Sequence, residues 1–177
     1  MKAVLISTQP KWVEKIISGK KTIEVRKTKP KLETPFKCCI YCTKSKNEFL
    51  TIRTGIEEIG NPAFAMNGKI IGEFVCDRID ELPCGVNQPY WLKEKTCITN
   101  EHYKGYLGNK DGYGWHISNL KVYDKPKELS EFYARCNIPE SRCKLCDNCY
   151  DREDYYGRHY AVKKITRPPQ SWQYIEV

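Results

Sequence analysis

The stretch Ser18–Arg26 (SGKKTIEVR) sets the end of one element and the start of the next, so it restricts the local fold more than any other part of the chain. Because glycine lacks a Cβ and readily takes the left-handed backbone, Gly19 predicts the end of the short apolar helix that precedes it. Apolar and charged residues then alternate with the period of a strand. We therefore expect Glu24 and Arg26 on the same face of that strand, with Lys21 in the turn that leads into it.

This grouping of two cations and one carboxylate has two interpretations. Such a group can hold a phosphate through Lys21 and Arg26, or the polar edge of a base, at the mouth of a sheet. Alternatively, Lys21 and Arg26 form surface ion pairs with Glu24 on a solvated strand face, and such pairs contribute little to stability. The charge pattern by itself leaves both interpretations open.

The charge balance favours a polyanionic partner. The chain of 177 residues has 30 Lys and Arg against 22 Asp and Glu, which gives a formal net charge of +8. Nucleic acid is the first candidate for such a basic protein, although net charge also favours solubility without any partner. The excess lies near the motif, which supports nucleic acid. The clustered residues are Lys20, Lys21, Arg26, Lys27, Lys29, Lys31 and Lys37.

Four stretches taken together resemble a known family. The first is the pattern G-x-K-x-x-E-x-R behind an N-terminal helix, and the others are Gly68–Asp77 (GKIIGEFVCD), Tyr113–Pro126 (YGWHISNLKVYDKP) and Arg167–Tyr174 (RPPQSWQY). In this order they resemble the ASCH domain, a small β-barrel related to the PUA RNA-binding fold, in the form found in bacteria and their phages. The resemblance covers most of the chain apart from roughly residues 45–66 and 134–160.

Hydrophobic patterning supports an α+β fold built mostly from strands. Short β-type apolar runs are separated by turn residues, and Pro10 opens a short helix at its first position. In the strand Phe36–Thr43, the alternation places Tyr41 outward. Together with the resemblance, this predicts one domain over residues 1–177: a PUA-like/ASCH β-barrel with short flanking helices and a Cys-rich insertion over residues 134–160.

The resemblance implies a cleft beside the strand of Lys21–Arg26. Aromatic faces stack on unpaired bases, so nearby aromatic residues are candidates for binding single-stranded nucleic acid. Trp115 and Trp172 have the alternative of packing in the barrel core, and Trp12 is expected to be a core anchor. His116 is expected to be a hydrogen-bonded structural residue rather than a catalyst. The expected nucleic-acid-binding residues are Lys20, Lys21, Glu24, Arg26, Lys27, Tyr113 and Trp115.

Two functions of different classes follow from the resemblance. As a binding module, the cleft captures single-stranded RNA or a modified nucleoside. As an enzyme, it hydrolyses a nucleoside or RNA, because some small ASCH proteins are amidohydrolases of N4-acetylcytidine and others are described as ribonucleases.

The enzyme interpretation has Lys21 and Glu24 as its candidate catalytic residues. Lys21 matches the lysine of the amidohydrolases, whereas Glu24 stands where they have a threonine, and their second glutamate cannot be placed in this chain. Glu24 would activate water and Arg26 would stabilise an oxyanion. A third possibility is a phage accessory protein that acts on a host protein.

Eight of the ten cysteines form two groups by position, and Cys84 and Cys97 are isolated. A cytosolic protein does not keep a disulfide framework, so core packing and metal binding are the expected roles. The thiols in strand-like apolar runs are expected to be inert core filling. They are Cys38, Cys39, Cys42 and Cys76.

The run C-x6-C-x2-C-x2-C predicts a structural zinc site. Four thiolates satisfy tetrahedral Zn²⁺, and the polar insertion around them has little apolar content to order it. An iron–sulfur cluster is the alternative, but Glu153 stands where a ferredoxin run has its fourth cysteine. His159 is an alternative to Cys136 as the fourth ligand. The predicted zinc ligands are Cys136, Cys143, Cys146 and Cys149.

No apolar run in the sequence is long enough to cross a bilayer, and the opening MKAVLIS is too short for a signal peptide. We therefore expect no membrane partner and predict a cytoplasmic protein.

Overall fold

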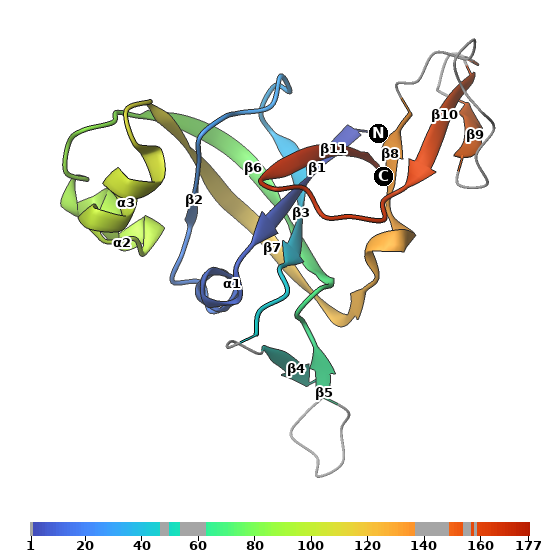
Figure 1. Ribbon diagram of the computed structural model, residues 1–177, viewed down its shortest axis with the longest axis horizontal. Coiled ribbons are helices and arrows are strands. Elements are labelled where there is room, and N and C mark those ends of the chain that lie inside the picture. The colour runs from blue at the N-terminus through green and yellow to red at the C-terminus, as the bar shows by residue number, and fades with distance from the viewer. Residues whose placement is uncertain (1, 47–49, 54–62, 137–148, 154–156, 158) are drawn as a thin grey trace.

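The computed structural model describes residues 2–46, 50–53, 63–136, 149–153, 157 and 159–177, and Figure 1 shows their arrangement. The helices are α1 (Pro10–Ile17), α2 (Tyr90–Thr96) and α3 (Asn100–Leu107), with a 3-10 turn η1 (Leu129–Glu131). The strands are β1 (Lys2–Thr8), β2 (Ile23–Arg26), β3 (Phe36–Cys42), β4 (Thr51–Arg53), β5 (Ala63–Ala65), β6 (Ile70–Leu82), β7 (Gly112–Lys127), β8 (Tyr133–Arg135), β9 (Cys149–Glu153), β10 (His159–Lys164) and β11 (Trp172–Glu176). Within these ranges, none of the helices has the length and apolar character needed to cross a membrane.

One large sheet organises the molecule. Its nine strands follow the order β2-β7-β6-β3-β1-β11-β8-β10-β9, and β4 and β5 form a separate hairpin. The strand β1 pairs parallel with β3 and antiparallel with β11, so the two ends of the chain lie side by side (Figure 1). This confirms the predicted α+β class. The sheet is curled but open over the described ranges, because β2 and β9 are its two edges.

The edge strand β2 is held by partners other than a second strand. One side of β2 pairs with β7. Next to its other side, the N–H of Thr22 donates to the carbonyl of Lys95 at 2.9 Å, and the side chain of Arg26 reaches the carbonyl of Ser7 in β1 at 2.9 Å. A helix end and polar side chains therefore stand where a fully closed barrel has a ladder of backbone hydrogen bonds.

The long strands β6 and β7 form the body of the sheet and bend along their length. Their pairing shifts register between Ile70 and Gly72 and again further along, as expected for strands that curl. A Cβ at Gly72 would lie 2.5 Å from the carbonyl oxygen of Lys121, so only glycine permits the strands to approach so closely there.

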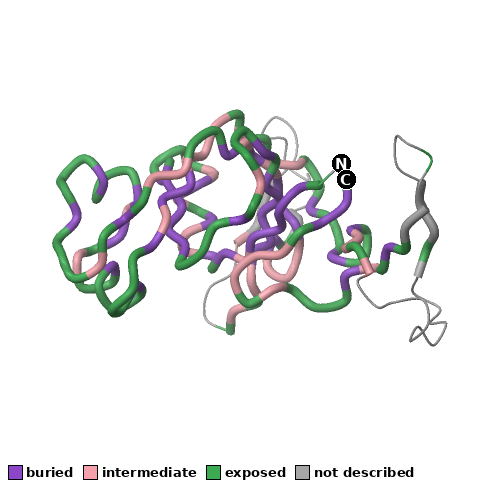
Figure 2. The backbone as a smooth tube through the Cα atoms, turned by 90° about the horizontal axis from the view of Figure 1, so that it is seen from above, coloured by how far each residue is buried: buried purple, intermediate pink, exposed green. Residues whose placement is uncertain are grey.

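Three apolar clusters fill the molecule, and Figure 2 shows the buried residues gathered in the central strands. The first packs α1 on one face of the sheet and includes Val13 and Trp115. The second covers the other face, and Tyr41, which was expected to point outward, is only 3% exposed there because both faces of the sheet are covered. The third packs α2 and α3 against β2 and includes Ile23 and Leu107.

The cysteines of the strands pack in the core, as predicted. Cys38, Cys39, Cys42 and Cys76 are buried free thiols. Burial raises the pKa of Cys39 to about 11 and that of Cys76 to about 12. Both thiols therefore stay protonated and weakly nucleophilic at neutral pH.

Three strands at the far edge of the sheet flank the Cys-rich segment. β8, β10 and β9 extend the sheet beyond β11. The backbone N–H of Cys136 donates to a carbonyl of β10, and Cys149 lies in β9 on the other side of β10. The other two predicted zinc ligands, Cys143 and Cys146, lie outside the described residues.

Candidate functional site

The motif at Gly19 forms the turn after α1, and the strand β2 follows it. Gly19 has φ +72°, the left-handed backbone predicted for the helix end. Glu24 lies between two cations: its Oε2 is 3.3 Å from Nζ of Lys21, and its Oε1 is 2.9 Å from an Nη of Arg26. Lys21, Glu24 and Arg26, hereafter the charged triad, are only 2, 7 and 4% exposed. This burial excludes the surface ion pair as an account of the motif.

Lys21 directs its ammonium group at three acceptors. Its Nζ donates to the carbonyls of Ile23 (2.9 Å) and Thr96 (2.8 Å), in addition to the ion pair with Glu24. The Thr96 carbonyl is at the C-terminal end of α2, where the helix dipole favours a cation. Burial lowers the pKa of Lys21 below its usual value, against the opposing effect of the Glu24 carboxylate.

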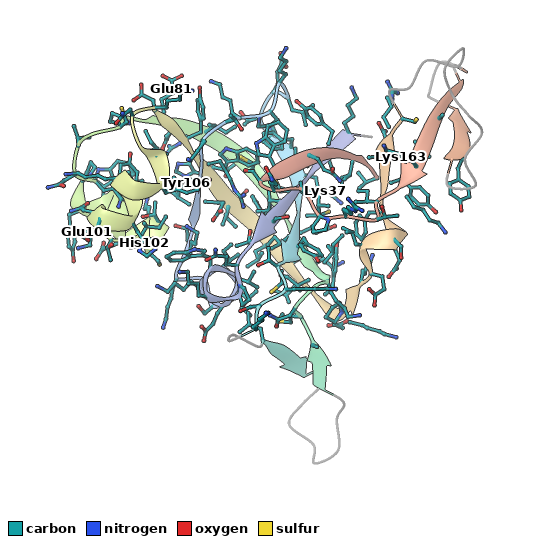
Figure 3. The ribbon with its side chains drawn as sticks, in the orientation of Figure 1. Lys37, Glu81, Glu101, His102, Tyr106 and Lys163 are labelled. Carbon is teal, nitrogen blue, oxygen red and sulfur yellow. The ribbon has the colours of Figure 1, made fainter. Side chains whose placement is uncertain are left out.

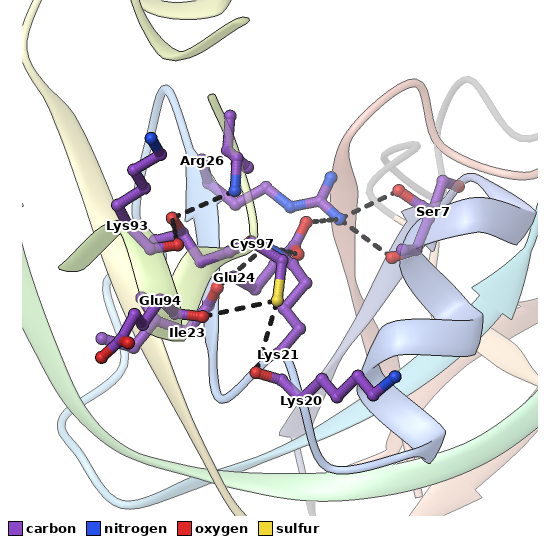
Figure 4. A network of polar contacts seen from close by, with 12 residues as sticks. Ser7, Lys20, Lys21, Ile23, Glu24, Arg26, Lys93, Glu94 and Cys97 are labelled. Carbon is purple, nitrogen blue, oxygen red and sulfur yellow. Dashed lines mark hydrogen bonds and ion pairs between the residues drawn. The ribbon is translucent and has the colours of Figure 1, made fainter. Parts of the chain in front are cut away.

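Arg26 connects the edge strand to the centre of the sheet. Its Nη atoms donate to the carbonyls of Ser7 and Ser171, each at 2.9 Å, and lie 3.2 Å from the hydroxyl of Thr8. Ser7 and Thr8 end β1, and Ser171 immediately precedes β11. One guanidinium group therefore spans from β2 to both central strands, and Figure 4 shows its contact with Ser7.

A pocket of about 1050 Å³ lies over the charged triad. Trp12 of α1 contributes one wall, and His102 and Tyr106 of α3 contribute another. His102 and Tyr106 are one helical turn apart, so they share one face of α3, and Tyr106 lies beside β2 in Figure 3. The lining continues at the other end with Tyr41, Thr43, Lys44, Ser130 and Thr166, and along one side with Pro168, Pro169 and Gln170.

Trp12 is an aromatic wall surrounded by positive charge. The Nζ atoms of Lys11, Lys15 and Lys21 lie 5.1, 5.0 and 5.4 Å from the centre of its ring. The ring meets that of His102 edge to face, with centroids 6.3 Å apart. Trp12 packs on the third apolar cluster, which agrees with the predicted anchor, but it is only partly buried and also lines the pocket.

Comparison with known proteins identifies the fold. No protein-family profile and no curated protein matches the sequence. Among solved structures, ASCH from Zymomonas mobilis aligns with 98% of this chain and 87% of its own, with a TM-score of 0.55 and 16% identity. A tyrosine-to-phenylalanine variant of that protein aligns with 99% of this chain and 91% of its own, with a TM-score of 0.56 and 17% identity. A serine-to-alanine variant aligns with 98% of this chain and 88% of its own, with a TM-score of 0.55 and 16% identity. The chain has the ASCH fold.

Within the ASCH fold, the predicted binding residues divide by position. The charged triad lines the pocket. Lys27 lies beside it, with Nζ 5.2 Å from the ring centre of Tyr106, which is a pocket residue. Lys20 is exposed in the turn before β2, and its carbonyl accepts from the thiol of Cys97 at 3.4 Å. Neither Lys20 nor Lys27 belongs to the pocket lining in the described part of the chain.

The two predicted aromatic residues of β7 have different environments. Tyr113 is partly buried, and the Nζ of Lys29 lies 4.9 Å from its ring centre. Trp115 is completely buried, with its ring 5.8 Å from that of Phe36 and 5.9 Å from that of Trp172. Trp115 is therefore a core residue and does not reach a base in this structure, because its position in β7 points its side chain into the first apolar cluster.

His116 is absent from the lining of the pocket in the described part of the chain. The Nε2 of His116 is 2.7 Å from Oδ2 of Asp80, so His116 is hydrogen-bonded as predicted for a structural residue. Over the described ranges, no three His, Cys, Asp or Glu side chains come together as ligands for a metal ion.

The sequence did not identify His102 and Tyr106 as pocket residues. A usable signal exists, because Thr99 caps α3 by accepting from the N–H of His102 at 3.3 Å, and the helical period then places His102 and Tyr106 on one face. The docking of α3 beside β2, which turns that face to the charged triad, is a long-range contact that no local pattern encodes.

Proposed function

We propose that the pocket binds a nucleotide of single-stranded RNA or a modified nucleoside. The observation that carries this proposal is an aromatic wall beside a buried charged floor: Trp12, with three lysine ammonium groups around its ring, lines the same pocket as Glu24. A flat apolar face and a fixed polar group are the two elements that hold and orient an unpaired base. The ASCH fold, related to an RNA-binding fold, agrees with this proposal.

The wall around Trp12 supplies affinity that does not depend on base identity. Stacking of a base on an aromatic side chain contributes about 1–3 kcal/mol. The ammonium groups of Lys11 and Lys15, at 5.1 and 5.0 Å from the ring centre, supply positive charge that would attract the phosphate of a nucleotide bound at this wall. Binding should therefore weaken steeply as salt rises, because phosphate contacts release counterions.

Glu24 supplies the selective part of the proposed recognition. Glu24 lines the pocket, but its Oε2 is buried 3.3 Å from Nζ of Lys21 and accepts no hydrogen bond of standard geometry from the described residues, so an amino group reaches it only if the Lys21 side chain shifts. A carboxylate oxygen of this kind pairs with the amino group of a base, as in contacts to the N4 amino group of cytosine. The proposed ligand is therefore a base that presents an amino N–H.

Titration with mononucleotides tests the pocket. Cytidine monophosphate should bind more tightly than uridine monophosphate, and Trp12→Ala should weaken both by about 5- to 150-fold, the equivalent of one stacked base. Glu24→Gln should remove the preference for cytidine. Circular dichroism of each variant establishes that the fold is intact. If wild-type protein binds neither mononucleotide nor single-stranded RNA, the proposal is wrong.

Hydrolysis of an acylated nucleoside or of RNA is the second candidate. The observation that favours it is the lowered pKa of Lys21 beside Glu24, since a lysine of depressed pKa can take part in proton transfer. Arg26 is less suited to stabilise an oxyanion, because its Nη groups already donate to the carbonyls of Ser7 and Ser171. If the protein is an enzyme, Glu24→Gln should abolish turnover and largely preserve affinity. Absence of products after incubation with acetylated cytidine and single-stranded RNA would favour the binding module.

We also propose that residues 134–160 are a zinc-ordered insertion in a single domain. The spacing of the four cysteines along the chain supports it. Cys136 and Cys149 lie on opposite sides of β10, two strand spacings or roughly 10 Å apart, so joint binding of one ion requires the two ends of the segment to move together. Four thiolate ligands leave no open coordination position, so the role of the zinc would be structural.

A further inference from the structure

The start of α2 exposes aromatic side chains outside the pocket. Tyr90 is 76% exposed and Trp91 is 48% exposed, more than any other aromatic residue in the described part of the chain. Val86, in the loop just before the helix, is also 48% exposed. A patch of exposed apolar side chains can mark a surface that binds a partner. The inward face of the same helix, by contrast, is buried through Leu92.

Lysine residues accompany these aromatic residues. The Nζ of Lys95 lies 5.8 Å from the ring centre of Trp91, and Lys93 is in the same last turn of α2. We call this surface the α2 platform; it consists of Val86, Tyr90, Trp91, Lys93, Glu94 and Lys95, and the Glu94 carboxylate lies beside the Tyr90 hydroxyl. An aromatic ring with an ammonium group beside it is the same combination as at Trp12, and it is the combination that stacks a base and neutralises its phosphate.

The α2 platform is attached directly to the pocket floor. The carbonyl of Lys95 accepts from the N–H of Thr22 at 2.9 Å, and the carbonyl of Thr96 accepts from Nζ of Lys21 at 2.8 Å. Figure 4 shows this end of α2 against Lys20 and Lys21. The helix advances about 7.5 Å from Trp91 to Thr96, so both surfaces are within reach of one short strand.

We propose that the α2 platform is a second contact for the strand whose nucleotide occupies the pocket, so that the ligand is a single-stranded oligonucleotide and not a free nucleoside. This inference rests on the proposed function of the pocket. A protein partner is the less favoured occupant, because the centres of protein interfaces are depleted of lysine, and here Lys95 lies beside the central ring of Trp91.

A length series of oligocytidylates of one, two, four and eight residues tests the α2 platform by fluorescence anisotropy. Affinity of the wild type should rise with length beyond one residue. Trp91→Ala should weaken binding of the longest oligonucleotide by about 5- to 150-fold and leave binding of the mononucleotide unchanged. Lys95→Glu should weaken the same oligonucleotide and reduce the dependence of its affinity on salt.

The chain offers a matched control. Tyr150 is 41% exposed, and the Nζ of Lys164 lies 5.4 Å from its ring centre, but it belongs to β9 at the opposite edge of the sheet from β2. Tyr150→Ala should leave every affinity in the series unchanged. An equal loss in Tyr150→Ala and Trp91→Ala would overturn the proposal, because the oligonucleotide would then bind without a defined path.

Three other results separate the possible failures. Equal wild-type affinity for one and eight residues would overturn the α2 platform while leaving the pocket in place. Unchanged oligonucleotide binding by Trp91→Ala and Lys95→Glu would overturn it as well, and a protein whose copurification is lost in those variants would then be the occupant. Oligonucleotide binding that depends on Trp91 without any mononucleotide binding would support the α2 platform and contradict the pocket.

Discussion

Replacement of Arg26 by alanine should destabilise the protein far more than removal of an ordinary surface charge. The guanidinium belongs to a residue that is 4% exposed, donates to the carbonyls of Ser7 and Ser171 at 2.9 Å, and lies 2.9 Å from Glu24. Its loss leaves a buried carboxylate with one cation fewer and two carbonyls without their donor. Breaking a buried charge pair in this way costs about 3–5 kcal/mol, and we expect the free energy of unfolding to fall by that amount.

Urea unfolding followed by circular dichroism measures this change. The matched control is Lys29→Ala, because the Nζ of Lys29 also pairs with a carboxylate, Glu81, at 3.6 Å, but both side chains are exposed. That control should lose about 0–1 kcal/mol. Arg26→Lys, which keeps a charge but fewer donors, should lie between the two and remains informative if the alanine variant does not fold.

A double-mutant cycle of Arg26→Ala with Glu24→Ala isolates the ion pair itself. The coupling energy should be about 1–3 kcal/mol, because the two side chains share a hydrogen-bonded network. A loss for Arg26→Ala no larger than that for Lys29→Ala, or a coupling energy near zero, would show that the charged triad does not hold β2 to the centre of the sheet.

Two further predictions concern protons and metal. Because the pKa of Lys21 in the folded protein lies below its ordinary value of 10.5, the unfolded chain binds more protons between those two values, and the stability contributed by Lys21 should increase as the pH rises toward 10.5. Unfolding free energies measured at several pH values should show wild type gaining on Lys21→Met over that range, and a difference that stays flat would contradict the buried position of the ammonium group. Protein purified without added metal should carry about one zinc per chain by elemental analysis. Less than half an equivalent, or a brown iron-containing sample, would rule out the proposed zinc insertion.

The motif spacing predicted which residues of β2 act together, but not how deeply they lie. A period of two assigns Glu24 and Arg26 to one face, and the structure brings both into contact with each other. The same period cannot reveal that this face is covered, because the cover comes from β1, α3 and the segment before β11. Tyr41 was misplaced for the same reason: alternation predicts two faces, and here both are buried.

The tryptophans show the same limit at the level of the site. Trp12 was expected in the core and lines the pocket, whereas Trp115 was expected at the pocket and is completely buried. Each lies in an apolar, regularly patterned element, so local sequence does not distinguish them. The difference depends on where α1 and β7 pack relative to β2, which is set by contacts between residues far apart in the chain.

The closure of the sheet at β2 by side chains has a consequence for any ligand of the pocket. The side chains at the bottom of the pocket, those of the charged triad, also join β2 to its neighbours. Binding of a ligand in the pocket and the stability of these contacts are therefore thermodynamically linked. A ligand that binds only the joined form raises its stability by RT ln(1 + L/Kd), where L is the free ligand concentration, so the gain grows with the logarithm of ligand concentration above Kd, and the ligand dissociates when the contacts of β2 open. Protection of the β2 amide hydrogens from exchange should therefore increase with occupancy of the pocket. A substitution at Lys21, Glu24 or Arg26 that changes ligand binding should therefore also change the stability of the contacts that hold β2 to the sheet.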